Sequence, residues 1–311
     1  SDIDKTNKDL RKAVALEKAK AQDETEVFAN DSKKKIYMHW MDDVPMGEQL
    51  DDDGDPLESI EGCLTDAQYN RDEHRKAVID DILDNWVSQS HNGKFHAILA
   101  TSSIPEAIKY YKLFAQRDCG LKTTAVFDPS DGNNESSIEK IDGIAQMLED
   151  YNSLFGTCFN ISGYASFKRD VCARLAHKTP YTAVENEPSK CLDILIVVDQ
   201  MLTGYDSKWL NTLYMDKFYK WSNIEMIIQA FSRTNRVFND DKPHGIIRYY
   251  RRPYTMKNII EYAFEQYSGQ KPYGIFVAKL IQNLENMNAA FSDINDIFKI
   301  AGIPDFFKTS R

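Results

Sequence analysis

The chain has 311 residues, of which 42% are hydrophobic, and its formal net charge at pH 7 is −10. It contains no apolar run near the ~20 residues that span a bilayer and no signal peptide, so we expect a cytoplasmic protein that does not enter a membrane. Its five cysteines form no Cys-x-x-Cys pair, which argues against a structural zinc site and against a disulfide framework.

The first 64 residues are predicted to be a linker and an acidic loop that follow an upstream domain. Residues 2–31 are rich in Lys, Glu and Ala, which predicts helix, and residues 35–40 predict a short strand. Residues 41–62 contain nine acidic residues and no Lys or Arg, so we expect a solvated loop. The Asp-x-Asp-x-Asp spacing at 51–55 is similar to a calcium-binding loop, but a proline stands where that loop needs glycine, so no metal site is expected.

Residues 65–255 alternate between strand patterns and helix patterns, which predicts a largely parallel sheet with helices between its strands. Short runs rich in β-branched and aromatic residues predict strands at 95–100, 122–127, 194–198, 211–216 and 246–249. Apolar residues at helical spacing predict helices at 65–86, 104–118, 137–155 and 164–177. The last two helices interrupt the alternation, as insertions would, and a polar loop is predicted at 128–134. Residues 259–300 are predicted to be mostly helical, within a C-terminal helical region at 256–311.

A candidate ligand-binding loop follows the predicted strand at 194–198. This strand is short and entirely apolar, as expected for a strand buried on both faces. Thr203 and Gly204 end the apolar run. We expect Gly204 and Asp206 to lie at the carboxyl edge of the strand, where open α/β sheets bind ligands.

A helix with a polar face is predicted from Ser222, where Ser-Asn-Ile-Glu forms a capping box. Its apolar residues recur at i, i+3, i+4 and i+7 and would face a core: Ile224, Ile227, Ile228 and Phe231. Gln229, Arg233 and Arg236 then fall together on the opposite side. Guanidinium groups suit phosphate oxygens, so this face is either a phosphate-binding surface or a solvated helix surface.

These motifs give the chain a resemblance to a known family. The segments 202–206 (Leu-Thr-Gly-Tyr-Asp) and 229–236 (Gln-Ala-Phe-Ser-Arg-Thr-Asn-Arg) resemble motifs V and VI of superfamily 2 helicases. More narrowly, they resemble the motor (R, restriction) subunit of type I restriction-modification enzymes. The segment 95–103 (Phe-His-Ala-Ile-Leu-Ala-Thr-Ser-Ser) is similar to the motif IV region of that family, and the resemblance covers about residues 69–250.

The chain departs from the family pattern in two places. Ser207 and Lys208 stand where the family usually continues motif V with Ala-Pro. Arg248 stands where the strand after motif VI usually has an acidic residue.

The resemblance implies an α/β fold, namely a RecA-like three-layer domain with a largely parallel sheet, helical insertions and a C-terminal helical extension. Residues 65–255 would be the second motor domain, which closes on a first motor domain across ATP with Mg. By the same resemblance, Arg233 and Arg236 would contact the γ-phosphate, one of them as the arginine finger, and the sequence does not say which. Gly204, Asp206 and Gln229 would lie beside the nucleotide, with Asp206 near the ribose.

The resemblance also implies contacts to double-stranded DNA. Thr203 and the group Thr101, Ser102 and Ser103 would touch DNA phosphates, which positions the duplex without reading its sequence. Ser103 has a second explanation, because Ser-Ile-Pro-Glu at 103–106 is itself a capping box whose hydroxyl would bond its own helix.

The chain lacks the part of a motor that grips the phosphates of ATP. A Walker A motif needs Gly-x-x-x-x-Gly-Lys-Ser/Thr, whereas Gly93-Lys94 is followed by Phe95 and has Ser88 in place of the first glycine. Residues 72–74 (Asp-Glu-His) are similar to a helicase Asp-Glu-x-His box, but they begin a predicted helix and are interpreted as a solvated helix face. The chain alone is therefore not expected to hydrolyse ATP, and the missing first motor domain would bind most of ATP and Mg.

The sequence-based hypothesis is the second motor domain of the ATP-dependent, DNA-translocating restriction subunit of a type I system. Its partners would be double-stranded DNA, the modification and specificity subunits, and the upstream motor and nuclease domains of the same chain. The alternatives are another superfamily 2 translocase without nuclease function, or a non-catalytic RecA-like interaction module. A small-metabolite domain is ranked last, because the chain has no glycine-rich fingerprint. The recognition site, the direction and step of translocation, and the oligomeric state do not follow from the sequence.

Overall fold

The computed structural model describes residues 2–117, 119–127, 137–198, 202, 205–238 and 241–268. The chain forms two compact units, Ser1–Ala263 and Phe264–Arg311. Of the second unit, only residues 264–268 are described, and they end helix α10 (Pro253–Ser268). Among the described helices, none is long and apolar enough to cross a membrane.

The first unit is built on a parallel sheet of five strands in the order β2-β3-β1-β4-β5. The strands are β1 (His96–Thr101), β2 (Thr123–Val126), β3 (Ile194–Val197), β4 (Leu210–Asp216) and β5 (Ile246–Tyr249). Every residue of β1, β3 and β4 is buried, because these strands lie inside the sheet and are covered on both faces. All five predicted strands of this region are confirmed within a residue or two.

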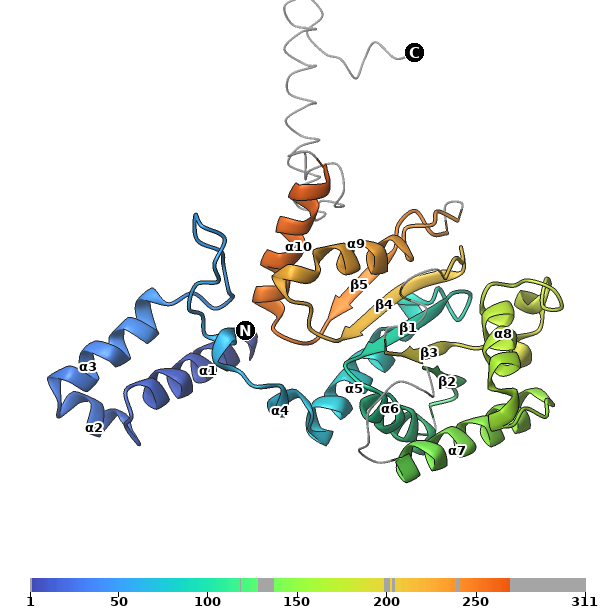
Figure 1. Cartoon of the computed structure of the whole chain (residues 1–311), viewed down its shortest axis with the longest axis horizontal. Helices are drawn as coiled ribbons and strands as arrows, with labels where there is room; N and C mark the ends of the chain where they lie inside the picture. The colour runs from blue at the N-terminus through green and yellow to red at the C-terminus, as the bar shows by residue number, and fades with distance from the viewer. Residues whose placement is uncertain are drawn as a thin grey trace, which may run out of the picture. The chain divides into compact units, whose positions relative to one another are not determined.

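Helices cover both faces of the sheet (Figure 1). Helix α6 (Ile104–Gln116) leads from β1 to β2, and α9 (Ile224–Ser232) leads from β4 to β5 in the opposite direction across the sheet. Because such crossovers are right-handed, these two helices lie on opposite faces. Helix α5 (Asp72–Gln89) packs beside α6. The result is the α/β, RecA-like, three-layer fold that the sequence predicted.

Two helices between β2 and β3 form the predicted insertions, α7 (Ser137–Phe155) and α8 (Tyr164–Leu175). They are joined by Arg174, whose Nε donates to the Tyr151 hydroxyl at 3.0 Å and whose Nη1 donates to the Lys190 carbonyl at 2.8 Å. Short 3-10 helices complete the described elements: Glu61–Cys63, Ile161–Gly163, Val184–Asn186, Pro188–Lys190 and Trp221–Asn223.

Residues 2–43 are mostly helical, and the strand predicted at 35–40 is wrong. They contain α1 (Asp2–Lys18), α2 (Glu24–Phe28), α3 (Asp31–Met38) and a π-helix (His39–Asp43). The Asn30 side chain accepts hydrogen bonds from the Ser32 and Lys33 amides, which starts α3. Three residues apart on this helical segment, Tyr37 and Trp40 both face a small local core. That core consists of Val14, Ala15, Ala19, Val27, Tyr37, Trp40, Val44 and Ile60.

Most acidic residues of the predicted acidic loop are solvated, but one of its carboxylates is buried. Residues 51–58 are exposed, and the Asp51 carboxylate accepts from the amides of Asp53 and Asp55 at 3.0 and 2.9 Å. Glu61 is buried instead, and its carboxylate accepts from the Tyr254 and Thr255 amides at 3.0 and 2.6 Å. Glu61 therefore supplies the N-terminal cap of α10 from a distant part of the sequence.

The remaining differences concern element boundaries. The helix predicted at 65–86 is two helices, α4 (Asp66–Tyr69) and α5. The predicted loop at 128–134 lies outside the described residues, as does the predicted helical segment beyond residue 268.

Candidate functional site

The candidate loop after β3 reaches the amino end of the sheet, which corrects the expected position of Asp206. Parallel strands need a connection that returns the chain to the opposite edge, and Asp206 comes late in the segment that joins β3 to β4. The adjacent Tyr205 is buried, and its hydroxyl lies 3.0 Å from Nε2 of His96, the first residue of β1. Burial holds the pKa of His96 well below its ordinary value, so this ring is neutral at pH 7. Thr203 and Gly204 lie outside the described residues.

The two sequence motifs meet at this edge. Arg236 Nε lies 3.1 Å from Asp206 Oδ1, and both side chains are more than half exposed, at 55% and 59%. The pair opens on a cavity of about 610 Å³. This cavity, called the motif cavity below, is lined by Ala176, Lys178, Asp206, Ser207, Lys208, Asn235, Arg236 and Val237. A carboxylate, two lysines and an arginine from three segments thus surround one space.

Arg233 joins the same two motifs through the backbone. Its Nε donates to the Leu202 carbonyl and its Nη1 donates to the Tyr205 carbonyl, each at 3.2 Å. The side chain is half-buried, unlike that of Arg236. Arg233 therefore anchors the loop that carries Asp206.

The predicted single helix face is wrong, because α9 ends at Ser232 and Arg236 lies beyond it. The Ser232 hydroxyl donates to the Gln229 carbonyl at 2.7 Å, and the Thr234 hydroxyl donates to the Phe231 carbonyl at 3.0 Å. These side chains take carbonyls that another helical turn would use, which ends the helix. Gln229 is exposed on α9 and is not among the residues that line the motif cavity.

The start of α9 also differs from the prediction. The 3-10 helix Trp221–Asn223 precedes it, and the Ser222 hydroxyl bonds the Asn223 side chain at 2.9 Å instead of forming a capping box. The predicted apolar stripe does face inward, with Ile227 and Phe231 buried.

The candidate DNA-contacting residues lie at the other end of β1. Thr101 is the last residue of this strand, and its buried hydroxyl donates to the Val197 carbonyl of β3 at 3.0 Å. Ser103 accepts from the Glu106 amide at 3.4 Å, which confirms its capping role at the start of α6. Ser102 is half-buried. At about 3.3 Å per residue, the length of β1 separates this edge from the motif cavity by roughly 20 Å.

Comparison with known proteins identifies the family of this chain. Residues 93–252, just over half of the chain, match the family described as T1R_D3-like, type I restriction enzyme subunit R domain 3. The chain belongs to the type I restriction enzyme R subunit family.

Individual relatives are endonuclease subunits of type I restriction enzymes. The type I restriction enzyme SsaAORF53P endonuclease subunit of Staphylococcus saprophyticus is 32% identical over 213 residues, which is 66% of this chain and 22% of that relative. The SauMRSORF196P endonuclease subunit of Staphylococcus aureus strain MRSA252 is 31% identical over 200 residues, 62% of this chain and 20% of that relative. The HindI endonuclease subunit of Haemophilus influenzae is 42% identical over 60 residues, 19% of this chain and 5% of that relative. The chain thus spans about a fifth of the length of its staphylococcal relatives.

A buried charge cluster, which the sequence did not reveal, lies at the carboxyl edge of the R-subunit sheet. The fully buried Asp216 ends β4 and accepts from Arg251 Nε at 2.9 Å, from Arg251 Nη2 at 3.0 Å and from the Tyr110 hydroxyl at 2.9 Å. His74 Nε2 lies 2.8 Å from the same carboxylate, so the interpretation of residues 72–74 as a solvated face is wrong for His74. Burial alone would raise the pKa of Asp216, but hydrogen bonds from His74 and Arg251 hold it below its ordinary value.

A second buried pair lies close by in sequence. Arg75 donates to both carboxylate oxygens of Glu106, at 2.7 and 2.8 Å, and both residues are buried. This engagement explains why Glu106 does not complete the reciprocal capping box with Ser103. The two buried pairs fix α5 and α6 against the end of β4.

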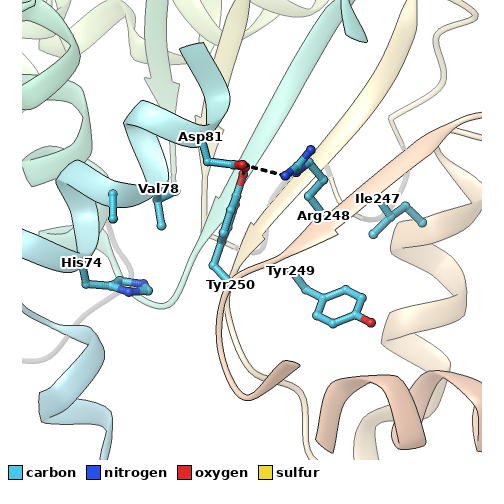
Figure 2. A pocket seen from close by; sticks show the side chains of 8 residues that line it. His74, Val78, Asp81, Ile247, Arg248, Tyr249 and Tyr250 are labelled. Atoms are coloured by element: carbon cyan, nitrogen blue, oxygen red, sulfur yellow. Dashed lines mark hydrogen bonds and ion pairs between the residues drawn. The ribbon is translucent and has the colours of Figure 1, made fainter. Parts of the chain in front are cut away.

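The unusual Arg248 of the R-subunit chain finds its counter-charge on α5. Arg248 Nη2 lies 2.6 Å from Asp81 Oδ1, and the Tyr250 hydroxyl donates to Asp81 Oδ2 at 2.8 Å (Figure 2). These side chains border a second cavity of about 610 Å³ between α5 and the edge strand β5. It is lined by His74, Ala77, Val78, Asp81, Ile247, Arg248, Tyr249 and Tyr250.

Proposed function

We propose that this chain is the second motor domain of the ATP-dependent, DNA-translocating restriction subunit of a type I system. It would supply motifs IV to VI, including the arginine finger, to a nucleotide held between two motor domains. The observation that supports this most directly is the exposed Arg236–Asp206 pair at 3.1 Å, which joins two motifs at one cavity.

Arg236 is the better candidate for the arginine finger. Exposed ion pairs contribute only about 0.2–1 kcal/mol, so a triphosphate can displace Asp206 at little cost. Arg233, by contrast, is held by two backbone carbonyls and would have to release both to reach a ligand. In this proposal Arg233 holds the loop and Arg236 meets the γ-phosphate.

The donor set of the motif cavity fits a nucleotide polyphosphate. Lys178, Lys208 and Arg236 offer cationic donors to phosphate oxygens, and Asp206 offers an acceptor to ribose hydroxyls. Bound ATP with Mg would supply the γ-phosphoryl group that is transferred to water. No cluster of three or more His, Cys, Asp or Glu that could hold a metal ion occurs in the described part of the chain. On the family resemblance and the lack of a Walker A motif in this chain, we assign the Mg ligands and most of the ATP contacts to the first motor domain.

Contacts to duplex DNA are proposed at the carboxyl edge of the sheet. Ser102 and the first amides of α6 lie there, and helix N-termini bind phosphates. The Thr101 hydroxyl already donates to the Val197 carbonyl, so Thr101 would contact a DNA phosphate through its backbone and not through its side chain. Thr203 is retained as a DNA contact and Gly204 as a nucleotide contact, both from the resemblance alone. The modification and specificity subunits, the upstream nuclease domain and a cytoplasmic location complete the proposal.

The test is duplex-stimulated ATP hydrolysis by the full-length subunit in its assembled complex. Removing an arginine finger costs about 10³- to 10⁵-fold in rate, so Arg236→Ala should lower turnover by that factor, to a residual rate that can still be measured, while the protein stays folded and binds DNA. The matched control is Arg169→Ala, which removes an exposed arginine of α8 whose bond goes to Ser166. Unchanged turnover in both Arg233→Ala and Arg236→Ala would refute the motor assignment and favour the non-catalytic interaction module.

A further inference from the structure

A fully buried lysine lies directly behind the motif cavity. Lys242 is 0% exposed, which is rare for lysine unless its amine is paired. Its Nζ donates to the Lys208 carbonyl at 3.2 Å and to the Arg236 carbonyl at 2.7 Å. Both acceptors are backbone carbonyls. The amine therefore fixes the position of the main chain at Lys208 and Arg236, and it does not engage the side chains of these two residues.

The two carbonyls belong to two separate segments that form walls of the cavity. Lys208 lies two residues after Asp206 in the segment that follows β3, and Arg236 lies in the segment that follows α9. The Lys242 amine therefore joins the two sequence motifs at the level of the backbone. The Arg236–Asp206 ion pair, which a ligand would have to break, is not the only link between these walls.

The lysine is itself held rigidly at its backbone. The Phe238 amide donates to the Lys242 carbonyl at 3.0 Å, and the Lys242 amide donates to the Phe238 carbonyl at 3.1 Å. The Phe238 ring packs against Phe95 and Trp209, with ring centroids 5.6 and 4.6 Å apart. These two aromatic residues directly precede β1 and β4, so Lys242 is anchored to the amino edge of the sheet.

The bonds of Lys242 do not depend on its charge. Burial lowers the pKa of Lys242 to about 8. A neutral amine still has two N–H groups, which is the number that the two carbonyls require. The link between the cavity walls is therefore present whether or not the amine is protonated.

We infer that Lys242 is a positioning residue for nucleotide hydrolysis, which fixes the segment of Asp206 relative to the segment of Arg236 and so sets where Arg236 meets a phosphate. This inference rests on the proposed function. A displacement of about 1 Å in a catalytic group can cost ~10²-fold in rate, so loss of the link should slow catalysis even though Lys242 touches no substrate.

The first experiment measures kcat and KM for ATP in the full-length, assembled subunit with Lys242→Met. Methionine approximates the aliphatic part of the lysine side chain and has no N–H donor. We expect kcat to fall by roughly 10- to 10²-fold with KM and DNA binding unchanged, because the misplaced group acts in the transition state. The control is Lys94→Met. It removes the ion-pair partner of Asp241, the residue next to Lys242, and leaves both carbonyl bonds intact, so it should keep the wild-type rate.

A double-mutant cycle separates positioning from general damage to the fold. If Lys242 acts through Arg236, Lys242→Met combined with Arg236→Ala should be no slower than Arg236→Ala alone. Losses that multiply would overturn the inference, since they would mean that Lys242→Met harms the enzyme by another route. Melting temperatures establish that each variant is folded. If Lys242→Met melts below the assay temperature, Lys242→Gln replaces it, because the shorter glutamine amide cannot span both carbonyls.

The outcomes for Lys242 and for the proposed function are distinct. Wild-type turnover in folded Lys242→Met, alongside a strongly impaired Arg236→Ala, would reject the positioning role and leave the motor assignment intact. Wild-type turnover in Arg233→Ala and Arg236→Ala would reject the motor assignment itself.

Discussion

The buried cluster around Asp216 makes a strong prediction about stability. Asp216→Asn removes a fully buried negative charge and turns an amide group toward donors from Arg251, Tyr110 and His74. Arg251 is only 2% exposed, so its guanidinium would lose the carboxylate that it hydrogen-bonds and could not replace it with water. Breaking a buried ion pair by removing one partner costs about 3–5 kcal/mol. We expect the free energy of unfolding of the 311-residue chain to fall by that amount.

Urea denaturation followed by circular dichroism measures this change. The matched control is Asp206→Asn, the same chemical substitution at an exposed carboxylate that also pairs with an arginine. An exposed pair contributes about 0.2–1 kcal/mol, so the control should remain close to wild type. Equal losses of stability in the two variants would refute the argument, because they would show that burial of the Asp216 cluster adds nothing to its effect.

Two further predictions follow from the same contacts. The folded-state pKa of Asp216 lies below its ordinary 3.8, so its stabilising contribution is complete above pH 3.8 and is lost as the pH falls through the folded-state value. Urea denaturation over this acidic range should show a smaller loss of unfolding free energy with falling pH for Asp216→Asn than for wild type. An equal dependence of the unfolding free energy on pH in the two proteins would contradict the lowered pKa of Asp216. Glu61→Ala removes the cap from two amides of α10 and should lower the free energy of unfolding by about 0.5–2 kcal/mol. Glu58→Ala, at an exposed position of the same loop, should change it by less than about 0.5 kcal/mol, and a similar loss in both variants would rule out the capping role.

The sheet and the family could be predicted because their signals are local. The run at 194–198 is apolar and β-branched, which is sufficient to predict a strand buried on both faces wherever it is placed. The same holds for the helical periods of α7 and α8. The strand predicted at 35–40 failed because the segment is short, and its local signal was overridden by the cap at Asn30 and by the packing of Tyr37 and Trp40 in a helical core.

The candidate site was only partly predictable. The residue types at Asp206, Arg233 and Arg236 indicated phosphate chemistry, but their arrangement was expected on one helix face and at the carboxyl edge. The structure brings Asp206 and Arg236 together at the amino edge of the sheet instead. Arg236 lies beyond α9 because hydroxyl groups end this helix at Ser232, and Asp206 lies at the amino edge because the connection after β3 runs back to that edge. The role of Lys242 had no signal in the sequence, since its acceptors are backbone carbonyls that any residue would present.

The sequence by itself determined the family and the order of strands and helices around the five-stranded sheet, because both depend on patterns within a few neighbouring residues. The tertiary structure alone decided which charges are buried and which groups meet. Glu61 reaches α10 across 194 positions, and His74 reaches Asp216 across 142. Such contacts depend on how the layers of the fold pack around each side chain. Burial then determines the role of a carboxylate: Asp206 is a solvated charge, whereas Asp216 is a buried charge that its partners hold in the core.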